Sequence, residues 1–386
     1  MKRSTDRILT THTGSLPRPQ DLVELIYQKE SGEHVDEQAL VDRVKSATAE
    51  IVRHQVESGV DVVSDGETGK PGYSNYVKDR LAGFDGEGRG VRRQAEADEF
   101  PEYYERLNED PYRKNRRTPA CTGPVTLKDS EAVQRDIANF KAAIEALGPN
   151  GPTDAFMTAA SPGVIALFLQ NQYYGTIEEY LGALAEAMRP EYEAIANAGV
   201  VLQLDCPDLA MSRTGGIFAE MSLKEFRDRI TLQVEALNHA VANIPPEQMR
   251  IHLCWGNYEG PHRRDIPLAD ILDIVVTARP SAISFEGANP RHGHEWALFE
   301  NVKLPEGKMV IPGVLDSSTN YVEHPELIAQ RIENYARLVG RENVMAGSDC
   351  GFCTFIGRNR VDEKVVYAKF EAMAEGARIA SERLWA

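Results

Sequence analysis

Residues His252-Leu253-Cys254 combine an imidazole and a thiol at a spacing that suits metal binding. They end the stretch Met249–Cys254, which we expect to form a β-strand, in which side chains at positions i and i+2 point to the same face. A histidine and a cysteine on one face can hold a single ion. The alternative is core packing, because free cysteine is among the most buried residue types.

Two further ligands of suitable type follow other expected strands. Glu286 ends the run Ala282–Glu286, and Cys350 follows the run Asn343–Ser348. Imidazole, thiolate and carboxylate groups all bind zinc, and two sulfur ligands favour zinc over magnesium or calcium. We therefore predict one Zn²⁺ ion, held by four residues: His252, Cys254, Glu286 and Cys350. Of the other cysteines, Cys353 is a weaker candidate, and the sequence predicts interior packing for Cys121 and Cys206.

The charge of this ligand set indicates which reaction it suits. Two thiolates and one carboxylate outweigh the charge of Zn²⁺, so the ion would be a poor Lewis acid for splitting water. It would still lower the pKa of an incoming thiol from about 8.5. If the thiol sulfur displaces Glu286, the charge stays balanced. These considerations predict attack of a zinc-bound thiolate on an alkyl carbon.

Two other roles for the metal stay open. A zinc hydrolase more often has histidine-rich ligands and an open position for water. A purely structural zinc usually has four closed protein ligands with more sulfur. Four ligands that come from distant parts of the chain favour a catalytic site over a structural one.

Short β-branched runs alternate with longer amphipathic stretches along the chain, and this pattern indicates the strands and helices that would position these ligands. It predicts parallel βαβ units, and no Gly-x-Gly-x-x-Gly follows a strand, so we expect an α/β fold of the (β/α)8 TIM-barrel type. The expected strands are Ile8–His12, Val60–Ser64, Pro119–Gly123, Ala155–Ala159, Val200–Asp205, Met249–Cys254, Ala282–Glu286, Lys308–Pro312 and Asn343–Ser348. The expected helices include Glu37–Ser58, Ile177–Ala198, Leu223–Asn243, Leu268–Ala278, Pro325–Val339 and Val361–Glu382.

In such a barrel the active site lies at the C-terminal ends of the strands. Residues able to do chemistry gather at those positions: His12, Ser15, Asp65, Glu67, Asp205, Cys206, His252, Cys254, Glu286, Asp349 and Cys350. The fold prediction therefore places the expected metal ligands around one mouth.

The whole chain, residues 1–386, is expected to be one domain, since no linker divides it. The segment Lys70–Arg117 breaks the alternation with glycine-rich turns and a charged, tyrosine-rich run. We interpret it as an insertion near residues 70–118 that forms a lid on the barrel, or a surface excursion without function.

Composition excludes several classes of protein. The formal net charge of −16 argues against nucleic-acid and membrane-surface partners. No apolar run is long enough to span a bilayer, the N-terminus lacks a signal-peptide core, and five cysteines are too few for a disulfide framework. We expect a cytoplasmic enzyme.

A set of motifs, taken in order, resembles a known family. The motifs are Thr11-His12-Thr13-Gly14-Ser15-Leu16-Pro17-Arg18-Pro19, Asp65-Gly66-Glu67, Thr122-Gly123-Pro124-Val125-Thr126, Leu204-Asp205, His252-Leu253-Cys254, Phe285-Glu286 and Ser348-Asp349-Cys350-Gly351. Over nearly its whole length the chain resembles the catalytic, C-terminal half of cobalamin-independent methionine synthase. It looks closer still to single-barrel relatives, which include epoxyalkane:coenzyme M transferases.

The resemblance implies roles for both substrate and metal. It implies the same four zinc ligands, and it implies that Ser15, Glu67 and Asp205 hold the amino-acid part of homocysteine. Two carboxylates can bind an ammonium group, and a serine hydroxyl with nearby backbone N–H groups can bind a carboxylate. The alternative for Glu67 and Asp205 is a solvated charge or a structural cap. If these residues serve another purpose, the thiol would be coenzyme M or another short thiol.

Two departures from the family leave the alkyl donor open. Leu127 and Lys128 follow the Gly-Pro-Val-Thr motif, where the full-length synthase has an aromatic residue that helps to hold folate. Ser317 and Ser318 follow Pro312-Gly313-Val314-Leu315-Asp316, where the synthase has a histidine. The donor could be folate, a corrinoid or an epoxide, so the predicted product is methionine or a thioether from an opened epoxide.

The segment Asn289–Glu295 follows the Glu286 ligand and adds further candidates. Arg291 could bind an anionic substrate tail, or cap a helix. His292 and His294, together with His12, are our candidates for a proton donor, with Tyr73 and Tyr76 after them.

Overall fold

The computed structural model describes residues 1–88, 94–109, 118–357 and 359–386. Its centre is a parallel seven-stranded sheet in which the strands are neighbours in chain order. Its strands are β1 (Val62–Ser64), β4 (Asp154–Ala160), β5 (Val201–Asp205), β6 (Met249–Leu253), β7 (Ala282–Phe285), β8 (Met309–Leu315) and β9 (Gly347–Ser348). This arrangement confirms the expected α/β barrel architecture.

The segment around Thr10 joins the two edges of this sheet. The carbonyl oxygen of Thr10 accepts a hydrogen bond from Val62 N at 3.0 Å, on the β1 side. On the β9 side, Thr11 N donates to Ala346 O at 2.8 Å, and Ala346 N donates to Leu9 O at 2.9 Å. The expected strand Ile8–His12 is therefore shortened to a single parallel bridge, Thr10 to Ala346, which still closes the ring.

A strand does form at the expected position Pro119–Gly123, but the prediction that it belongs to the barrel is wrong. In the structure β3 (Ala120–Leu127) pairs antiparallel with β2 (Leu81–Asp85), in a separate two-stranded sheet. Gly83 (φ 93°) makes the pairing possible, since a Cβ there would lie 2.7 Å from Pro124 O. The β2 segment offers β3 a partner outside the barrel, and a strand pattern alone does not reveal which sheet a strand joins.

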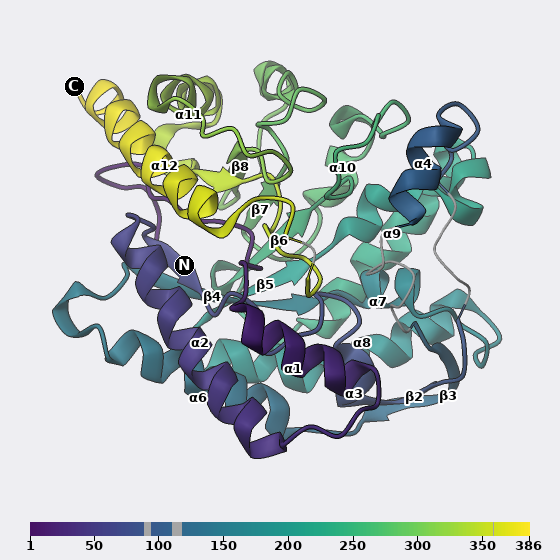
Figure 1. The fold of residues 1–386 in the computed structure, drawn as a ribbon. Coiled ribbons are helices and arrows are strands. Elements are labelled where there is room, and N and C mark those ends of the chain that lie inside the picture. Colours follow the sequence, from purple (N-terminus) through teal and green to yellow (C-terminus); the bar gives the residue numbers. More distant parts are fainter. Residues whose placement is uncertain (89–93, 110–117, 358) are drawn as a thin grey trace.

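Helices cover the outside of the barrel (Figure 1). Within the described residues the α-helices are α1 (Gln20–Glu30), α2 (Glu37–Glu57), α3 (Val77–Arg80), α4 (Pro101–Asn108), α6 (Glu131–Glu145), α7 (Pro162–Phe168), α8 (Ile177–Asn197), α9 (Leu223–Ala240), α10 (Leu272–Val275), α11 (Pro325–Val339) and α12 (Glu363–Leu384). The expected helix Leu268–Ala278 is broken into a 3₁₀ turn, Leu268–Asp270, and α10, because Ile271 between them has φ −131°.

The described part of the insertion reaches the loop after β6. Helix α4 lies apart from the two-stranded β2–β3 sheet (Figure 1), and the Tyr103 hydroxyl donates to Glu259 O at 2.9 Å. Glu99 pairs with Arg263 at 2.8 Å and also with Arg264. These contacts connect the segment to the barrel, while residues 89–93 and 110–117 of the predicted lid lie outside the described residues.

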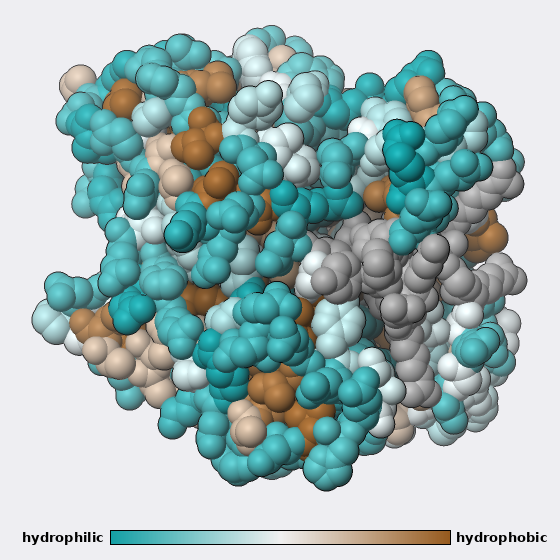
Figure 2. All heavy atoms as spheres, viewed as in Figure 1, coloured by the Kyte–Doolittle hydropathy of each residue, from teal (hydrophilic) through white to brown (hydrophobic). Residues whose placement is uncertain are grey.

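The face seen in Figure 2 is mostly hydrophilic, with scattered hydrophobic residues. Among the described residues, no helix is both long and apolar enough to span a bilayer.

Candidate metal and thiol site

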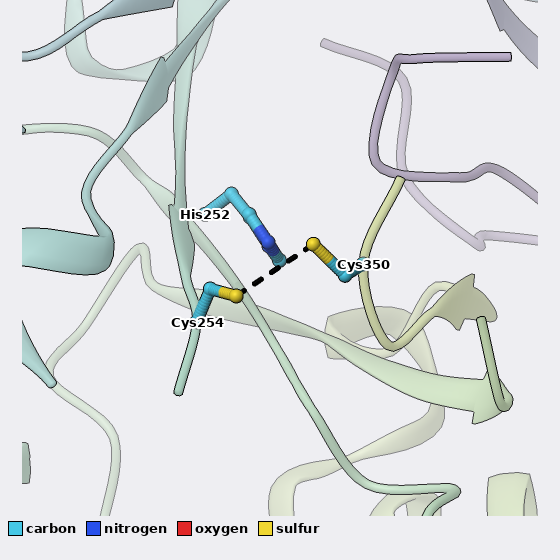
Figure 3. A group of neighbouring side chains, drawn as sticks. All are labelled: His252, Cys254 and Cys350. Atoms are coloured by element: carbon cyan, nitrogen blue, oxygen red, sulfur yellow. Dashed lines mark hydrogen bonds between the residues drawn. The ribbon is translucent and has the colours of Figure 1, made fainter. Parts of the chain in front are cut away.

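Three predicted ligands meet at the C-terminal mouth of the barrel. His252 lies on β6, Cys254 directly follows that strand, and Cys350 follows β9. One ligand atom from each lies within 4.8 Å of the others (Figure 3). All three side chains are buried. We refer to His252, Cys254 and Cys350 as the His-Cys-Cys group.

The imidazole of His252 has the features of a metal ligand. Both ring nitrogens are buried and neither has a hydrogen-bond partner. Burial, reinforced by the positive charge of Arg250, lowers the pKa of His252 to about 3, so the ring is neutral at physiological pH. A neutral ring with an unused lone pair is the form that binds a metal, and an unpaired buried polar atom is costly. The residues present therefore fit a Zn²⁺ ion.

The two sulfur atoms of the group face each other as free thiols. Cys254 Sγ lies 3.6 Å from Cys350 Sγ, well beyond the length of a disulfide bond. The hydrogen bond with Cys350 and burial raise the pKa of Cys254 well above its usual value. Gly256 N donates to Cys254 Sγ at 3.2 Å, which favours the thiolate. A divalent cation between the sulfurs would supply the missing counter-charge.

The fourth predicted ligand, Glu286, lies beside this group and has protein partners for both oxygens. Its Oε1 accepts from Trp255 N and its Oε2 from Asn289 Nδ2, both at 2.8 Å. Burial, followed by the charge of Cys254, raises the pKa of Glu286 well above its usual value. Its carboxylate does not belong to the group whose ligand atoms all lie within 4.8 Å of one another in the described part of the chain.

Asp349 organises the loop that carries Glu286. Its Oδ1 accepts from Gly287 N at 2.8 Å and Ala288 N at 2.7 Å, and its Oδ2 accepts from Asn289 N and Nδ2 at 2.8 and 2.9 Å. Burial raises its pKa to about 6, although these backbone N–H groups lower it. The sequence predicted that Asp349 lies at a strand end but did not indicate its role.

Two buried carboxylates form a second part of the mouth. Glu67 Oε1 accepts from Thr158 Oγ1 at 2.9 Å, and Glu67 Oε2 has no partner. Asp205 Oδ1 accepts from Gln203 Nε2 at 2.8 Å, and Arg250 Nε donates to Gln203 Oε1 at 2.8 Å. Burial raises the pKa of both acids; the charge of Glu67 raises that of Asp205 further. Neither acid has a salt-bridge partner among the described residues.

Lys70 is a member of this region that the sequence did not single out. Its Nζ donates to Thr158 O at 2.6 Å and to Thr158 Oγ1 at 3.2 Å, and it lies 4.5 Å from the centre of the Tyr76 ring. Its positive charge lowers the pKa of Glu67 and of Asp205, against the effect of burial. The position of Lys70, three residues after Glu67, was the feature of the sequence that could have indicated its place in the site.

Ser15 lies against the loop that carries Cys350. Phe352 N donates to Ser15 O at 2.9 Å, and a Cβ built on Gly351 would lie 2.0 Å from Ser15 Oγ. On its other side the loop is held by Asn257, whose Nδ2 donates to Gly351 O at 2.7 Å. Ser317, one of the two serines in the region where the family resemblance implies a histidine, donates to Asn257 Oδ1 at 3.0 Å.

His12, a predicted proton donor, is surrounded by protein partners. Its Nε2 pairs with Gln55 Oε1 at 2.7 Å, and its Nδ1 accepts from Gly14 N at 3.1 Å. Phe156 and Phe370 lie beside the ring at 5.4 and 5.3 Å between ring centres. Burial lowers the pKa of His12 to about 3. These contacts are those of a neutral histidine that supports the fold.

His292 also has protein partners on both ring nitrogens. Nδ1 lies 3.0 Å from Glu295 Oε2, and Nε2 lies 3.0 Å from Asp265 Oδ2. Burial lowers its pKa, but the hydrogen bonds to the two acids outweigh burial and raise it to about 10. The ring packs on Trp255 at 4.2 Å between ring centres, so an imidazolium supports the residue that follows Cys254.

The other two residues predicted on this segment, Arg291 and His294, are exposed. Arg291 donates to Arg263 O at 3.2 Å. The structure thus joins Arg291 to the loop after β6 and leaves the His294 ring at the surface. Tyr76 is buried, and its hydroxyl donates to Glu191 at 2.6 Å.

Comparisons with known proteins identify the family. Residues 176–377 match the model of the cobalamin-independent synthase catalytic domain, a range that includes every predicted metal ligand. The chain is 23% identical to a methionine synthase from Thermococcus kodakarensis over 379 residues, covering 97% of this chain and 94% of that protein. It is 24% identical to a methionine synthase from Pyrococcus furiosus, covering 96% and 91%.

A solved structure shows the same fold. A B12-independent methionine synthase from Shewanella sp. W3-18-1 superimposes with a TM-score of 0.72 at 19% identity, covering 98% of this chain and 99% of that chain. The family match extends over more than half of the 386 residues. The chain therefore belongs to the cobalamin-independent synthase family, whose catalytic domain it contains.

Proposed function

We propose that this protein is a zinc-dependent methyltransferase that methylates the sulfur of homocysteine and forms methionine. The observation that carries the proposal is the His-Cys-Cys group, in which both nitrogens of a buried, neutral His252 have no partner. The relatives in the comparison are methionine synthases, which supports the same reaction here. The zinc ion, when bound by His252, Cys254, Cys350 and Glu286, supplies a lowered pKa for the substrate thiol.

The two carboxylates of the mouth are suited to the ammonium group of homocysteine. Glu67 Oε2 is buried without a partner, and Asp205 lies close enough to Glu67 for each charge to act on the other. An ammonium between them would satisfy the free oxygen and offset their repulsion. We assign the homocysteine carboxylate to the Ser15 hydroxyl, which adjoins the Cys350 loop.

The bond changes in the proposed reaction are those of a simple displacement. The thiol proton is lost to solvent, and an electron pair of the thiolate sulfur forms the new bond to the methyl carbon. The bond between that carbon and the donor breaks, and its electron pair leaves with the donor. The protein positions the sulfur through the amino-acid contacts, which makes the attack effectively intramolecular.

The proposal assigns no proton transfer to the predicted histidines. Both nitrogens of His12 and of His292 have protein partners, and His294 and Arg291 lie at the surface. Methyl transfer to a thiolate needs no general acid at the sulfur. No contact among the described residues favours an epoxide, coenzyme M or hydrolysis, so we do not extend the proposal to them.

Zinc-edge X-ray absorption of the purified protein tests the proposal. We expect two sulfur neighbours at zinc in the protein alone and a third after addition of homocysteine. Coenzyme M, added separately at the same concentration, is the control and should leave the count at two. If homocysteine adds no sulfur, the proposed function is wrong. If only coenzyme M adds one, the thiol assignment is wrong.

A further inference from the structure

Glu286 is a predicted metal ligand whose two carboxylate oxygens both accept hydrogen bonds from the protein. The carboxylate accepts one hydrogen bond on each oxygen, from Trp255 N and from Asn289 Nδ2. Both donors lie in the buried or half-buried rim of the mouth. Hydrogen bonds to an ionised carboxylate are about twice as strong as those between neutral groups. The position is therefore a built carboxylate site.

Asn289 is fixed in place by contacts on three sides. Asp349 Oδ2 accepts from both Asn289 N and Asn289 Nδ2. The Asn289 side-chain oxygen accepts from the backbone N–H groups of Arg291 and His292, each at 3.0 Å, which closes an Asx turn. Its amide nitrogen thus has a set direction, with one donation to Asp349 and one to Glu286.

We propose that Asn289, together with the backbone N–H of Trp255, is the holding site for the Glu286 carboxylate when a substrate thiol takes its place at the metal. This inference rests on the proposed function. Asn289 is in this sense a positioning residue, and it acts on thiol affinity through Glu286. In the structure the Glu286 carboxylate occupies this holding site, with one hydrogen bond on each oxygen.

In this proposal the Glu286 carboxylate and the substrate thiol compete for one position at the metal. A carboxylate that has good partners away from the metal gives up its place to a thiol more readily. Loss of the Asn289 amide should therefore weaken thiol binding while the metal stays bound. The expected effect is about tenfold, which corresponds to about 1.4 kcal/mol.

Asn289→Ser is the variant of choice, because a serine hydroxyl can still close the turn but is too short to reach Glu286. Asn171→Ser is a matched control. The side-chain oxygen of Asn171 accepts from Tyr173 N and Tyr174 N at 3.1 and 2.9 Å, an Asx turn of the same spacing outside the site. Asn289→Ala serves as a second variant if the serine variant does not fold.

The experiment titrates zinc-loaded protein with homocysteine and follows the third sulfur neighbour by zinc-edge X-ray absorption. We expect an apparent Kd about tenfold higher in Asn289→Ser, an unchanged Kd in Asn171→Ser, and one zinc per chain in both. In a Glu286→Gln background the added Asn289→Ser change should have less than half of this effect, since the two residues act as a pair.

The outcomes separate the inference from the proposed function. If the unmodified protein gains no sulfur, the proposed function fails. If it gains one and Asn289→Ser binds homocysteine with the same Kd, the holding-site proposal is overturned. An effect of Asn289→Ser that persists in full in the Glu286→Gln background would also overturn it, because it would show an action that does not pass through Glu286.

Discussion

The sulfur atoms of Cys254 and Cys350 lie 3.6 Å apart, although 96 residues separate them in the chain. One follows β6 and the other follows β9, with β7 and β8 between them in the ring. The approach of two buried thiols, with no disulfide between them, is the geometry that a shared metal ion requires.

Replacement of either sulfur ligand should remove the metal. We expect Cys254→Ala and Cys350→Ala to lower zinc from about one per chain to near zero, with methyl transfer falling to background, because the three ligands left, only one of them a thiolate, bind zinc weakly. Elemental analysis after dialysis measures the zinc. Cys121→Ala is the control, since that buried thiol lies outside the predicted metal site, on β3, where it donates to Gly123 O at 3.4 Å. Full zinc in the Cys254 variant would contradict the metal assignment.

Removing the charge of either mouth carboxylate should weaken homocysteine binding and leave zinc in place. For Glu67→Gln and Asp205→Asn we expect a loss of roughly 30-fold or more, the usual effect of breaking a buried charge pair. Equilibrium binding measures the effect. As a control, 4-mercaptobutyrate, which lacks the amino group, should bind the variants and the unmodified protein alike. Equal losses for both thiols would show that the acids do not recognise the ammonium.

The charge of Lys70 should determine how far the pH can fall before homocysteine binding weakens. Burial raises the pKa of Glu67 and of Asp205, and the charge of Lys70 opposes this rise. In Lys70→Met both pKa values rise further, so the acids become protonated, and lose the ammonium, at higher pH. We expect the acid limb of a Kd-against-pH profile to move up by about one unit, and Lys70→Arg to restore it. Weakening that is uniform across pH would assign Lys70 a packing role only.

The stability contribution of His292 should decrease in alkaline solution. Burial lowers its pKa, but hydrogen bonds to Asp265 and Glu295 raise it to about 10, above the ordinary value of 6.5. The contribution is therefore complete below pH 6.5 and is lost as pH rises through about 10. Urea unfolding at several pH values should show His292→Gln destabilised by a few kcal/mol, ~3 or more at pH 6, and less at pH 10. His294→Gln, at the exposed position two residues on, is the control and should match the unmodified protein.

Much of the fold followed from local patterns. Stretches such as Met249–Cys254 and Ala282–Glu286 match β6 and β7 to within one residue, because short stretches of strand-forming residues between helical ones indicate parallel strands whatever their neighbours are. Pairing partners depend on the whole chain. Ile8–His12 kept only one bridge, and β3 paired with β2 outside the barrel, since a strand sequence does not specify which edge it meets.

The sequence by itself determined the ligand types, and the i, i+2 spacing of His252 and Cys254 predicted that both would point into the mouth. Only the tertiary structure decided that Cys350 joins them, that both nitrogens of His12 and of His292 are used within the protein, and that Asp349 and Asn289 hold the Glu286 loop. Contacts of this kind depend on how parallel strands are aligned around a closed ring. That alignment arises from the packing of residues far apart in the chain, and no short stretch of sequence encodes it.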